Sequence, residues 1–329
     1  MAVAAERSAA PARPQRRSGK ARGRRRSTRL DRVAYGVLRV AMGALGALPL
    51  ASAVRVGAAG GRVAWVLARG LRRVGMRNLE LAFPERPVAD RRRILRASFA
   101  NLGRMAAELA HLQRMTADDL RTLVRFEDEA WWAENVGAPR DTGALILSGH
   151  FGNWELLVFA HGMRGFPVSM VHRTVANPFV DRWLNTLRAR AGTRLVRKRQ
   201  AAGGVLRALH DRQLLVLPFD QNSTRAIGVF VEFFGEQAST NSGIARLALR
   251  TGAPIVPVFI VREGGTPRHR VHVLPIMYAQ RSGDPESDVK RVTQELSAVF
   301  EGMVRRHPEQ WLWMHKRWKT RPPGLPKLY

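Results

Sequence analysis

Cysteine is absent from the 329 residues of the chain, which excludes a disulfide framework, a thiolate metal site and any covalent intermediate on a cysteine. Acidic residues are scarce: 26 aspartates and glutamates stand against 55 lysines and arginines, which gives a formal net charge of +29. A long apolar run is missing too. The longest stretch without a charged residue, 40–54, has 15 residues, whereas a helix that crosses a bilayer needs about 20.

The charge balance favours a polyanion as partner. A surplus of this size attracts both nucleic acid and an anionic membrane surface. Arginine dominates over lysine, and its planar guanidinium suits two-bond contacts with phosphate or carboxylate. Since 45% of the residues are hydrophobic, the chain can also bury a sizeable core.

Three segments differ in composition. Residues 1–32 are rich in Ala, Pro and Arg and nearly free of bulky apolar side chains, so we expect a disordered basic tail. Residues 33–71 are mostly apolar, and Arg39 and Arg55 flank the longest uncharged run. Because basic residues at both ends favour the same side of a membrane, we expect a membrane-associated helical segment at the interface. A single span and an ordinary buried helix are the alternatives. Residues 72–329 have the composition of a folded domain.

Beyond residue 143, short apolar runs alternate with helical patterns. This alternation predicts an α/β fold with a mostly parallel central sheet flanked by helices. The predicted strands are 144–147, 168–171, 214–218, 254–260 and 271–275. The predicted helices are 90–115, 155–161, 180–190, 204–210, 242–249 and 287–305.

The sharpest local pattern is His150-Phe-Gly-Asn-Trp-Glu155. It follows an apolar run and precedes a helix, so His150 lies where a strand ends, a position that faces the ligand crevice in open α/β sheets. An imidazole takes a proton reliably when its second nitrogen is held by an acceptor, which a carboxylate one turn later can supply. We therefore predict that His150 is a general base oriented by Glu155. No second histidine lies at metal-ligand spacing, so we expect no metal site.

The wider pattern resembles a known family. His150–Glu155 resembles the HX4(D/E) motif of glycerolipid acyltransferases, and its surroundings resemble the late acyltransferases of lipid A biosynthesis, of the lauroyl and myristoyl type. The matching segments cover roughly residues 30–329 in order: Asn78 to Pro84, HFGNWELL, His172-Arg173, Asn177 to Asp181, Pro218 to Gln221, Val231 to Gly235, residues 247–257 and the final WLWMHKRWKTRP. The basic tail lies outside the resemblance.

The resemblance implies an O-acyltransferase of lipopolysaccharide biosynthesis that works without an acyl-enzyme. His150 would deprotonate a hydroxyl of a lipid A precursor, which attacks the thioester of an acyl carrier protein or coenzyme A. Glu155 would keep His150 oriented. No cofactor is implied beyond this co-substrate. The implied partners are the thioester, the glycolipid acceptor and the membrane, and not nucleic acid. We expect a monomer at the cytoplasmic face of the inner membrane.

Four polar residues are predicted to bind substrate. The resemblance assigns Arg173 and Arg188 to this role, since a guanidinium can bind one phosphate through two bonds; surface charge is an equal alternative for Arg188. Asp220 follows an apolar strand at another crevice position, where turn capping is the alternative. Asn177 belongs to a matched segment and is assigned with them.

Residues 228–235 are predicted to form a short strand. Core packing is the first interpretation of its apolar side chains. The resemblance also places this segment near a groove for the acyl chain, so Phe230, Phe233 and Phe234 are candidate groove residues.

The run 311–319 alternates tryptophans with cations, which suits a membrane–water boundary or stacking on single-stranded nucleic acid. We prefer the membrane because residues 33–56 are apolar. Two other functions remain open. One is an acyltransferase for another glycolipid or a lysophospholipid, such as a phosphatidylinositol mannoside. The other is a basic nucleic-acid-binding protein, which would leave HFGNWE unexplained.

Overall fold

A computed structural model describes residues 28–137, 142–197 and 201–329. Its helices are α1 (Thr28–Ala47), α2 (Leu50–Leu67), α3 (Arg69–Ala82), α4 (Val88–His111), α5 (Ala117–Leu123), α6 (Glu129–Trp132), α7 (Trp154–Met163), α8 (Pro178–Arg190), α9 (Ala201–His210), α10 (Gly243–Thr251) and α11 (Pro285–Arg306), with a π turn η1 (Ala133–Gly137) and a 3-10 turn η3 (Pro308–Gln310). Its strands are β1 (Val124–Phe126), β2 (Ala144–Ser148), β3 (Val168–His172), β4 (Arg194–Arg197), β5 (Leu214–Pro218), β6 (Gly228–Phe233), β7 (Glu236–Asn241), β8 (Ile255–Arg262) and β9 (His269–Val273).

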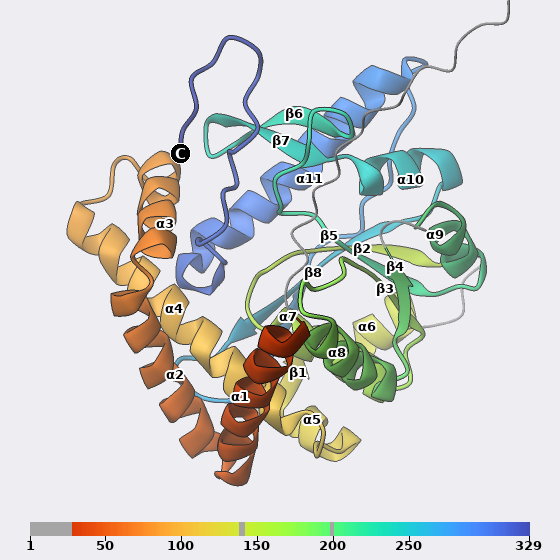
Figure 1. Cartoon of the computed structure of the whole chain (residues 1–329). Helices are drawn as coiled ribbons and strands as arrows, with labels where there is room; N and C mark the ends of the chain where they lie inside the picture. The colour runs from red at the N-terminus through yellow and green to blue at the C-terminus, as the bar shows by residue number, and fades with distance from the viewer. Residues whose placement is uncertain (1–27, 138–141, 198–200) are drawn as a thin grey trace, which may run out of the picture.

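A seven-stranded sheet forms the centre of the molecule, in the order β1-β9-β8-β2-β5-β3-β4 (Figure 1). The strands from β8 to β4 run parallel, whereas β9 pairs antiparallel with β8 and β1 pairs parallel with β9. A separate antiparallel hairpin joins β6 to β7. The predicted α/β fold with a mostly parallel sheet is confirmed.

Each face of the sheet packs against its own core. Because side chains alternate along a strand, Leu145 and Leu147 of β2 face one core, which also receives residues of α9, α10 and α11. Ala144 and Ile146 face the other core, which receives residues of α5, α6, α7 and α8. All five residues of β2 are buried, as expected of a strand covered on both sides.

The predicted strands and helices of the folded domain are present, with ends that differ by a few residues. Helix 90–115 corresponds to α4, and residues 228–233 form β6 as expected. Three strands were not predicted: β1, β4 and β7. The first is very short, while β4 (RLVR) and β7 (EQASTN) are too polar to read as strands from sequence.

The apolar segment 33–71 is divided among α1, α2 and the start of α3, with a break before Pro49. Figure 1 shows α1–α4 gathered on one flank of the molecule. None of the helices in the three described ranges combines the length and the apolar character needed to cross a bilayer. Residues 1–27 of the predicted tail lie outside the described residues, while Thr28–Arg32 form the first turns of α1 instead of continuing a tail.

Helix α2 packs on α4 with almost no side chain between the two backbones. A Cβ atom at Gly61 would lie 2.2 Å from the carbonyl oxygen of Phe99, and one at Gly103 would lie 2.0 Å from the carbonyl oxygen of Gly57. Only glycine permits this approach. The opposite side of α2 faces outward, where Val63 and Val66 are each 56% exposed.

The C-terminal tryptophans do not lie at the surface. Trp311, Trp313 and Trp318 are fully buried, and Arg317 is buried with its guanidinium 5.0 Å from the ring centre of Phe233. The preference for a membrane boundary is therefore wrong for these rings, which complete the core that contains α11.

Candidate active site

The ends of β2 and β5 meet at the centre of the sheet. Ser148 pairs with Pro218 in the parallel register, and the amide of Phe219 donates to the carbonyl of Ser148 at 3.0 Å. His150 and Asp220 each come two residues after this pair. The ladder therefore brings the two side chains to the same point at the carboxyl edge of the sheet, where open α/β proteins bind ligands.

His150 is held by Asp220. Its Nδ1 lies 2.9 Å from Oδ1 of Asp220, and the other carboxylate oxygen accepts a bond from Nε1 of Trp311 at 2.9 Å. The amide nitrogen of Gln221 lies 3.3 Å from Nε2 of His150. A proton on Nδ1 satisfies both contacts, because it leaves the lone pair of Nε2 to accept from Gln221.

The pair has the electrostatics of a base with a fixed counter-charge. Burial disfavours the imidazolium, but the charge and hydrogen bond of Asp220, with a smaller contribution from Glu155, outweigh it and raise the pKa of His150 above 6.5. Burial likewise opposes ionisation of Asp220, yet His150 and the bond from Trp311 lower the pKa of its carboxyl below its usual value. Asp220 is thus an anion in a fully buried position.

Glu155 does not hold His150, so that prediction is wrong. Its carboxylate forms a two-bond ion pair with Arg188, in which Nη2 donates to Oε1 at 2.5 Å and Nε donates to Oε2 at 2.9 Å. The physical reason is the position of a stronger partner: Glu155 is on the first turn of α7, and its carboxylate meets the guanidinium of Arg188 on the last turn of α8. It acts on His150 only through its charge.

The turn between His150 and Glu155 has an unusual backbone. Gly152 has φ of +58°, and a Cβ atom there would lie 1.8 Å from the carbonyl oxygen of Ile260, so only glycine fits. The amide of Gly152 donates to the carbonyl of Gln310 at 2.8 Å, and the carbonyl of His150 accepts from the amide of Leu312 at 3.1 Å. The C-terminal segment therefore clamps the turn.

A cavity of about 380 Å³ opens beside His150. Its polar wall contains Glu155, His172, Arg173, Arg188 and Gln221. Its apolar wall is formed by Leu157, Val158, Met170, Val171, Val175, Leu184 and Val216. A second, smaller cavity of about 20 Å³ adjoins it: the two share Leu157, Val158 and Val216, and the smaller one also borders Trp132 and His161.

Two of the four predicted substrate residues line this cavity. Arg173 is exposed there and makes no ion pair with the residues that the structure describes, while Arg188 is committed to Glu155. Asp220 is next to the cavity but behind His150, so the structure corrects its role from substrate contact to partner of the imidazole. Asn177 is buried away from the cavity: its side chain caps α8 and donates to the carbonyl of Asp31 at 2.8 Å.

The predicted acyl groove is also corrected. Phe233 and Phe234 are buried among aromatic rings, including Trp311 and Trp313, and Phe230 is half-buried on β6. None of the three lines the cavity at His150. Core packing, the first interpretation of this segment, holds for Phe233 and Phe234. Phe234 has a φ of +55° and lies in the turn after β6, so the alternation of the strand does not set the direction of its side chain.

Gln221, Trp311 and His315 are parts of this site that no sequence pattern indicated. His315 holds the turn after β5, with Nε2 3.2 Å from the carbonyl oxygen of Asp220. The signal for the His150–Asp220 pair was present, because each follows an apolar strand by the same interval. Finding it required knowing that β2 and β5 are neighbours.

The chemistry available here is proton transfer beside an apolar cavity. Nε2 of His150 faces the cavity and can accept a proton, and Asp220 stabilises the imidazolium that results. Arg173 supplies positive charge on the same wall, where the charge of Arg188 is balanced by Glu155. An acceptor with an acidic group and a partner with an apolar chain would both fit.

Comparison with known proteins agrees with this chemistry. A model of the family described as bacterial lipid A biosynthesis acyltransferase matches residues 24–320. The chain is 29% identical over 290 residues to the lipid A biosynthesis lauroyltransferase of Escherichia coli K12, a match that covers 86% of this chain and 90% of the relative.

Two further relatives come from the same organism. The lipid A biosynthesis palmitoleoyltransferase is 26% identical over 257 residues, which cover 78% of this chain and 81% of the relative. The lipid A biosynthesis myristoyltransferase is 27% identical over 266 residues, which cover 80% of each chain.

Proposed function

The chain belongs to the bacterial lipid A biosynthesis acyltransferase family and is an acyltransferase, and from this premise we propose that it transfers a fatty acyl chain from an acyl thioester to a hydroxyl of a lipid A precursor. The observation that carries the proposal is the His150–Asp220 pair at the mouth of a cavity with an apolar wall. The family resemblance read from the sequence is confirmed. The nucleic-acid-binding alternative finds no support in the comparisons.

The proposed reaction is a direct transfer. Nε2 of His150 takes the proton of the acceptor hydroxyl after that hydroxyl displaces Gln221, and the alkoxide-like oxygen attacks the thioester carbonyl. The carbon–sulfur bond then breaks, and the imidazolium returns the proton to the departing thiolate. An ester and a free thiol result, so no group remains on the enzyme. We propose that no cofactor takes part.

Asp220 serves this reaction in two ways. Its bond to Nδ1 fixes the tautomer that leaves Nε2 unprotonated, and its charge stabilises the imidazolium during attack. Because Trp311 occupies the second carboxylate oxygen, Asp220 cannot rotate away from His150 without losing a buried bond. This corresponds to the role that the sequence assigned to Glu155.

The acyl chain is proposed to lie along the apolar wall of the cavity. Leu157, Val158 and Val216 line both the large cavity and the smaller one, so they mark the direction in which a chain would run from the thioester. Burial of a chain against this wall provides binding free energy of roughly 0.8 kcal/mol per methylene. The groove therefore passes between α7 and the sheet and not beside Phe230, Phe233 and Phe234.

Arg173 and Arg188 are proposed to attract the acidic groups of the substrates. Phosphate groups occur in a lipid A precursor and in the carrier arm of either donor, acyl carrier protein or coenzyme A. Arg173 is the better candidate for direct contact because it is exposed and has no carboxylate partner in the described ranges. Arg188 keeps its charge partly neutralised by Glu155.

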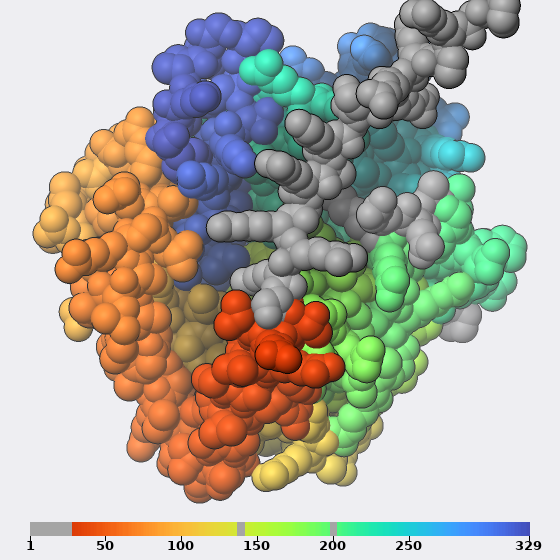
Figure 2. Space-filling model, in the orientation of Figure 1, coloured from red at the N-terminus to blue at the C-terminus, as the bar shows by residue number. Residues whose placement is uncertain are grey.

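We place the enzyme at a membrane surface through α1 and α2. Val33, Val37 and Val40 recur on one face of α1, each at least 63% exposed. Figure 2 shows α1 and α2 at the surface on the flank opposite α9 and α10. Apolar side chains beside arginines such as Arg39 and Arg55 suit the boundary between acyl chains and anionic head groups. We propose a monomer at the cytoplasmic face of the inner membrane.

Mass spectrometry of lipid A tests the function directly. A strain that lacks this chain should produce lipid A that is one acyl group lighter, and the wild-type gene should restore it. The His150→Ala variant should not restore it although it still sediments with membranes. The His210→Ala variant, whose side chain is 90% exposed on α9, serves as the matched control and should restore it fully.

Transfer assays with purified enzyme distinguish between the possible acceptors. Transfer to a lysophospholipid or a mannosylated lipid, and none to a lipid A precursor, would replace the proposed acceptor and leave the acyltransferase chemistry intact. Full activity of His150→Ala would refute the proposed base. Complete release of the chain from membranes by high salt would contradict the apolar contact through α1 and α2, because salt weakens only the electrostatic part of binding.

A further inference from the structure

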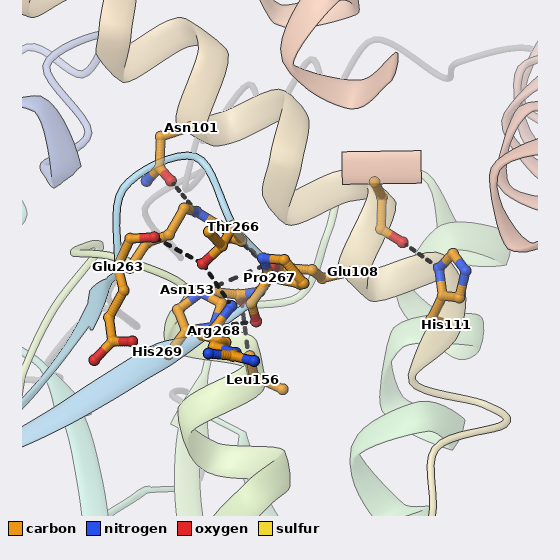
Figure 3. A network of polar contacts seen from close by, with 12 residues as sticks. Asn101, Glu108, His111, Asn153, Leu156, Glu263, Thr266, Pro267, Arg268 and His269 are labelled. Atoms are coloured by element: carbon orange, nitrogen blue, oxygen red, sulfur yellow. Dashed lines mark hydrogen bonds and ion pairs between the residues drawn. The ribbon is translucent and has the colours of Figure 1, made fainter. Parts of the chain in front are cut away.

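A buried carboxylate lies behind the active-site turn, outside the machinery described above. Glu108 is on the last turns of α4 and is 1% exposed. Its Oε2 accepts a bond of 2.6 Å from Nδ2 of Asn153, the residue two positions before Glu155 (Figure 3). It does not line the cavity, and among the described residues its hydrogen bonds reach neither His150 nor Asp220.

Asn153 uses both ends of its amide. Its Oδ1 accepts from the amide of Leu156 at 3.1 Å and so caps the start of α7, while its Nδ2 reaches Glu108. A cap needs only the oxygen. The nitrogen therefore does something else: it ties the junction between the His150 turn and α7 to helix α4.

Arg262 makes this tie possible. Its guanidinium forms two bonds to Glu108, one of them 2.7 Å from Nη2 to Oε2, and its Nε donates to Asn101 at 2.9 Å. The backbone amide of Arg262 donates to Oε1 of Gln310 at 2.7 Å, and the carbonyl of Gln310 holds Gly152. The ion pair thus reaches the turn by two routes, through Asn153 and through Gln310.

Two other titratable groups lie near the pair. His269 is 3.7 Å from Glu108, but burial lowers its pKa to about 4, so it is neutral at ordinary pH. Arg104 is a second cation that interacts electrostatically with both Arg262 and Glu108. A buried ion pair is weak evidence for stability, since apolar side chains of similar volume often stabilise a core as well or better. Beyond filling space, the Glu108–Arg262 pair holds the carboxylate of Glu108 in one position.

We propose that Glu108 is a positioning residue for acyl transfer: it acts through Asn153 to fix the His150 turn relative to the Glu155–Arg188 pair. This inference rests on the proposed function. The His150 side of the junction carries the base, and the Glu155 side carries the charged wall of the cavity. Loss of the Glu108–Asn153 bond lets the His150 turn move relative to the Glu155–Arg188 pair. A misplacement of about 1 Å can lower a reaction rate on the order of 100-fold.

The test reverses the direction of one hydrogen bond. Asn153→Asp keeps the cap on α7 but places a carboxylate against that of Glu108. Adding Glu108→Gln to Asn153→Asp lets Gln at position 108 donate to Asp at position 153 and keeps the net charge of the cluster, but it gives up the bond that Oε2 of Glu108 accepts from Nη2 of Arg262. We expect kcat to fall 10- to 100-fold in the single variant, with little change in KM for the donor, and to recover in part in the double variant.

Further measurements separate positioning from folding. Asn153→Ser keeps a capping oxygen but cannot reach Glu108, and it leaves the Glu108–Arg262 pair intact, so it should fold and still lose kcat. Asp284→Ser, which changes the cap of α11 far from the site, is the control and should keep kcat. All rates are measured well below the melting temperature. The acid limb of the pH profile should not move, because His150 and Asp220 keep their contacts.

The outcomes are distinct. Wild-type kcat in well-folded Asn153→Ser, or a double variant that regains melting temperature without kcat, would overturn the positioning role. Absence of transfer by the wild-type chain would instead contradict the proposed function. In that case crystal structures decide the inference: the separation of His150 and Arg188 should change in Asn153→Asp and return in the double variant, and an unchanged separation would overturn it.

Discussion

Nδ1 of His150 lies 2.9 Å from Oδ1 of Asp220, a residue 70 positions further along the chain. The carboxylate is fully buried and is held from its other side by Trp311. The imidazole is thus anchored by a neighbouring strand and not by the helix that follows it. The effects of substitutions at this site should follow from that arrangement.

Asp220→Asn should reduce kcat/KM by roughly 100- to 10,000-fold, because the base loses its orienting acceptor. It should also shift the pH profile. In the wild type the pKa of His150 is raised, so activity is lost on acidification already above pH 6.5. Without the anion, burial dominates and lowers that pKa, so the acid limb moves to lower pH. Asp211→Asn, at an exposed ion pair, is the control. If the acid limb of the pH–activity profile does not move in Asp220→Asn, Asp220 is not the counter-charge of His150.

Glu155 and Arg188 should behave as one unit. Glu155→Gln and Arg188→Met each break the two-bond pair and leave a partner without its counter-charge. We expect the double variant to lose little more kcat/KM than the worse single variant, which a double-mutant cycle measures. Glu155→Gln should shift the acid limb of the pH–activity profile less than Asp220→Asn does. Additive losses would mean that the two side chains act separately.

Val216 should control the length of the acyl chain, because it lines both the large cavity and the smaller one. Val216→Phe should shift donor preference toward shorter chains, and Leu157→Ala should shift it toward longer ones. Competition among acyl donors, read by mass spectrometry of the product, measures the shift. Ile227→Phe, at an exposed site that lines neither cavity, should leave the preference unchanged. If all variants show the same preference among acyl donors, the acyl chain does not bind in this cavity.

His161 should make stability depend on pH. Burial lowers its pKa to about 4 from 6.5, although its Nδ1 keeps a 2.7 Å bond to the carbonyl of Leu157. Between these pH values the unfolded chain binds a proton that the folded chain does not, so the free energy of unfolding decreases as pH falls from 6.5 toward 4. His150, whose pKa is raised, adds stability as pH falls toward 6.5, above this range, and contributes a constant amount below it. Urea unfolding at pH 7 and pH 5 should show a smaller loss in His161→Phe, whereas the exposed control His210→Phe should match the wild type.

Two adjacent glycines of α2 offer a matched pair. Gly61→Ala places a Cβ atom 2.2 Å from the carbonyl oxygen of Phe99, while the same atom at Gly60 meets nothing within 4 Å. We expect Gly61→Ala to destabilise the protein by about 1–3 kcal/mol and Gly60→Ala to stabilise it by up to about 1 kcal/mol, since alanine favours a helix. Thermal melting compares them. Equal melting temperatures would show that α2 is not held against α4 in solution.

Much of the fold could be predicted because its strands are buried on both faces and therefore appear as short apolar runs. β2 and β5 are of this kind. β4 was missed because an edge strand can carry arginines, and β7 because it belongs to a polar hairpin outside the main sheet. Local patterns contain no information about which strands lie at an edge.

The site was predicted in part for the same reason. His150 could be identified from its place between a strand and a helix, and Asp220 from its place after another strand. Their contact depends on the order of strands in the sheet, which no local spacing reveals. Glu155 was close in sequence and was therefore assigned to His150, while its true partner, Arg188, lies 33 residues away. Core packing was the first interpretation of Phe233 and Phe234 and is confirmed. The groove that the resemblance suggested for them is not found, because the distant tryptophans Trp311 and Trp313 pack against these rings.

The pairing of Ser148 with Pro218 sets the turns that carry His150 and Asp220 side by side, so the catalytic geometry starts from the ladder. Residues added between α9 and β5 would lengthen a surface connection without displacing either side chain. One residue added inside β5 would shift the register of the ladder and move the turn that carries Asp220 away from His150. The protein should therefore tolerate insertions in its connections and lose its activity through a slip of a single position in this strand.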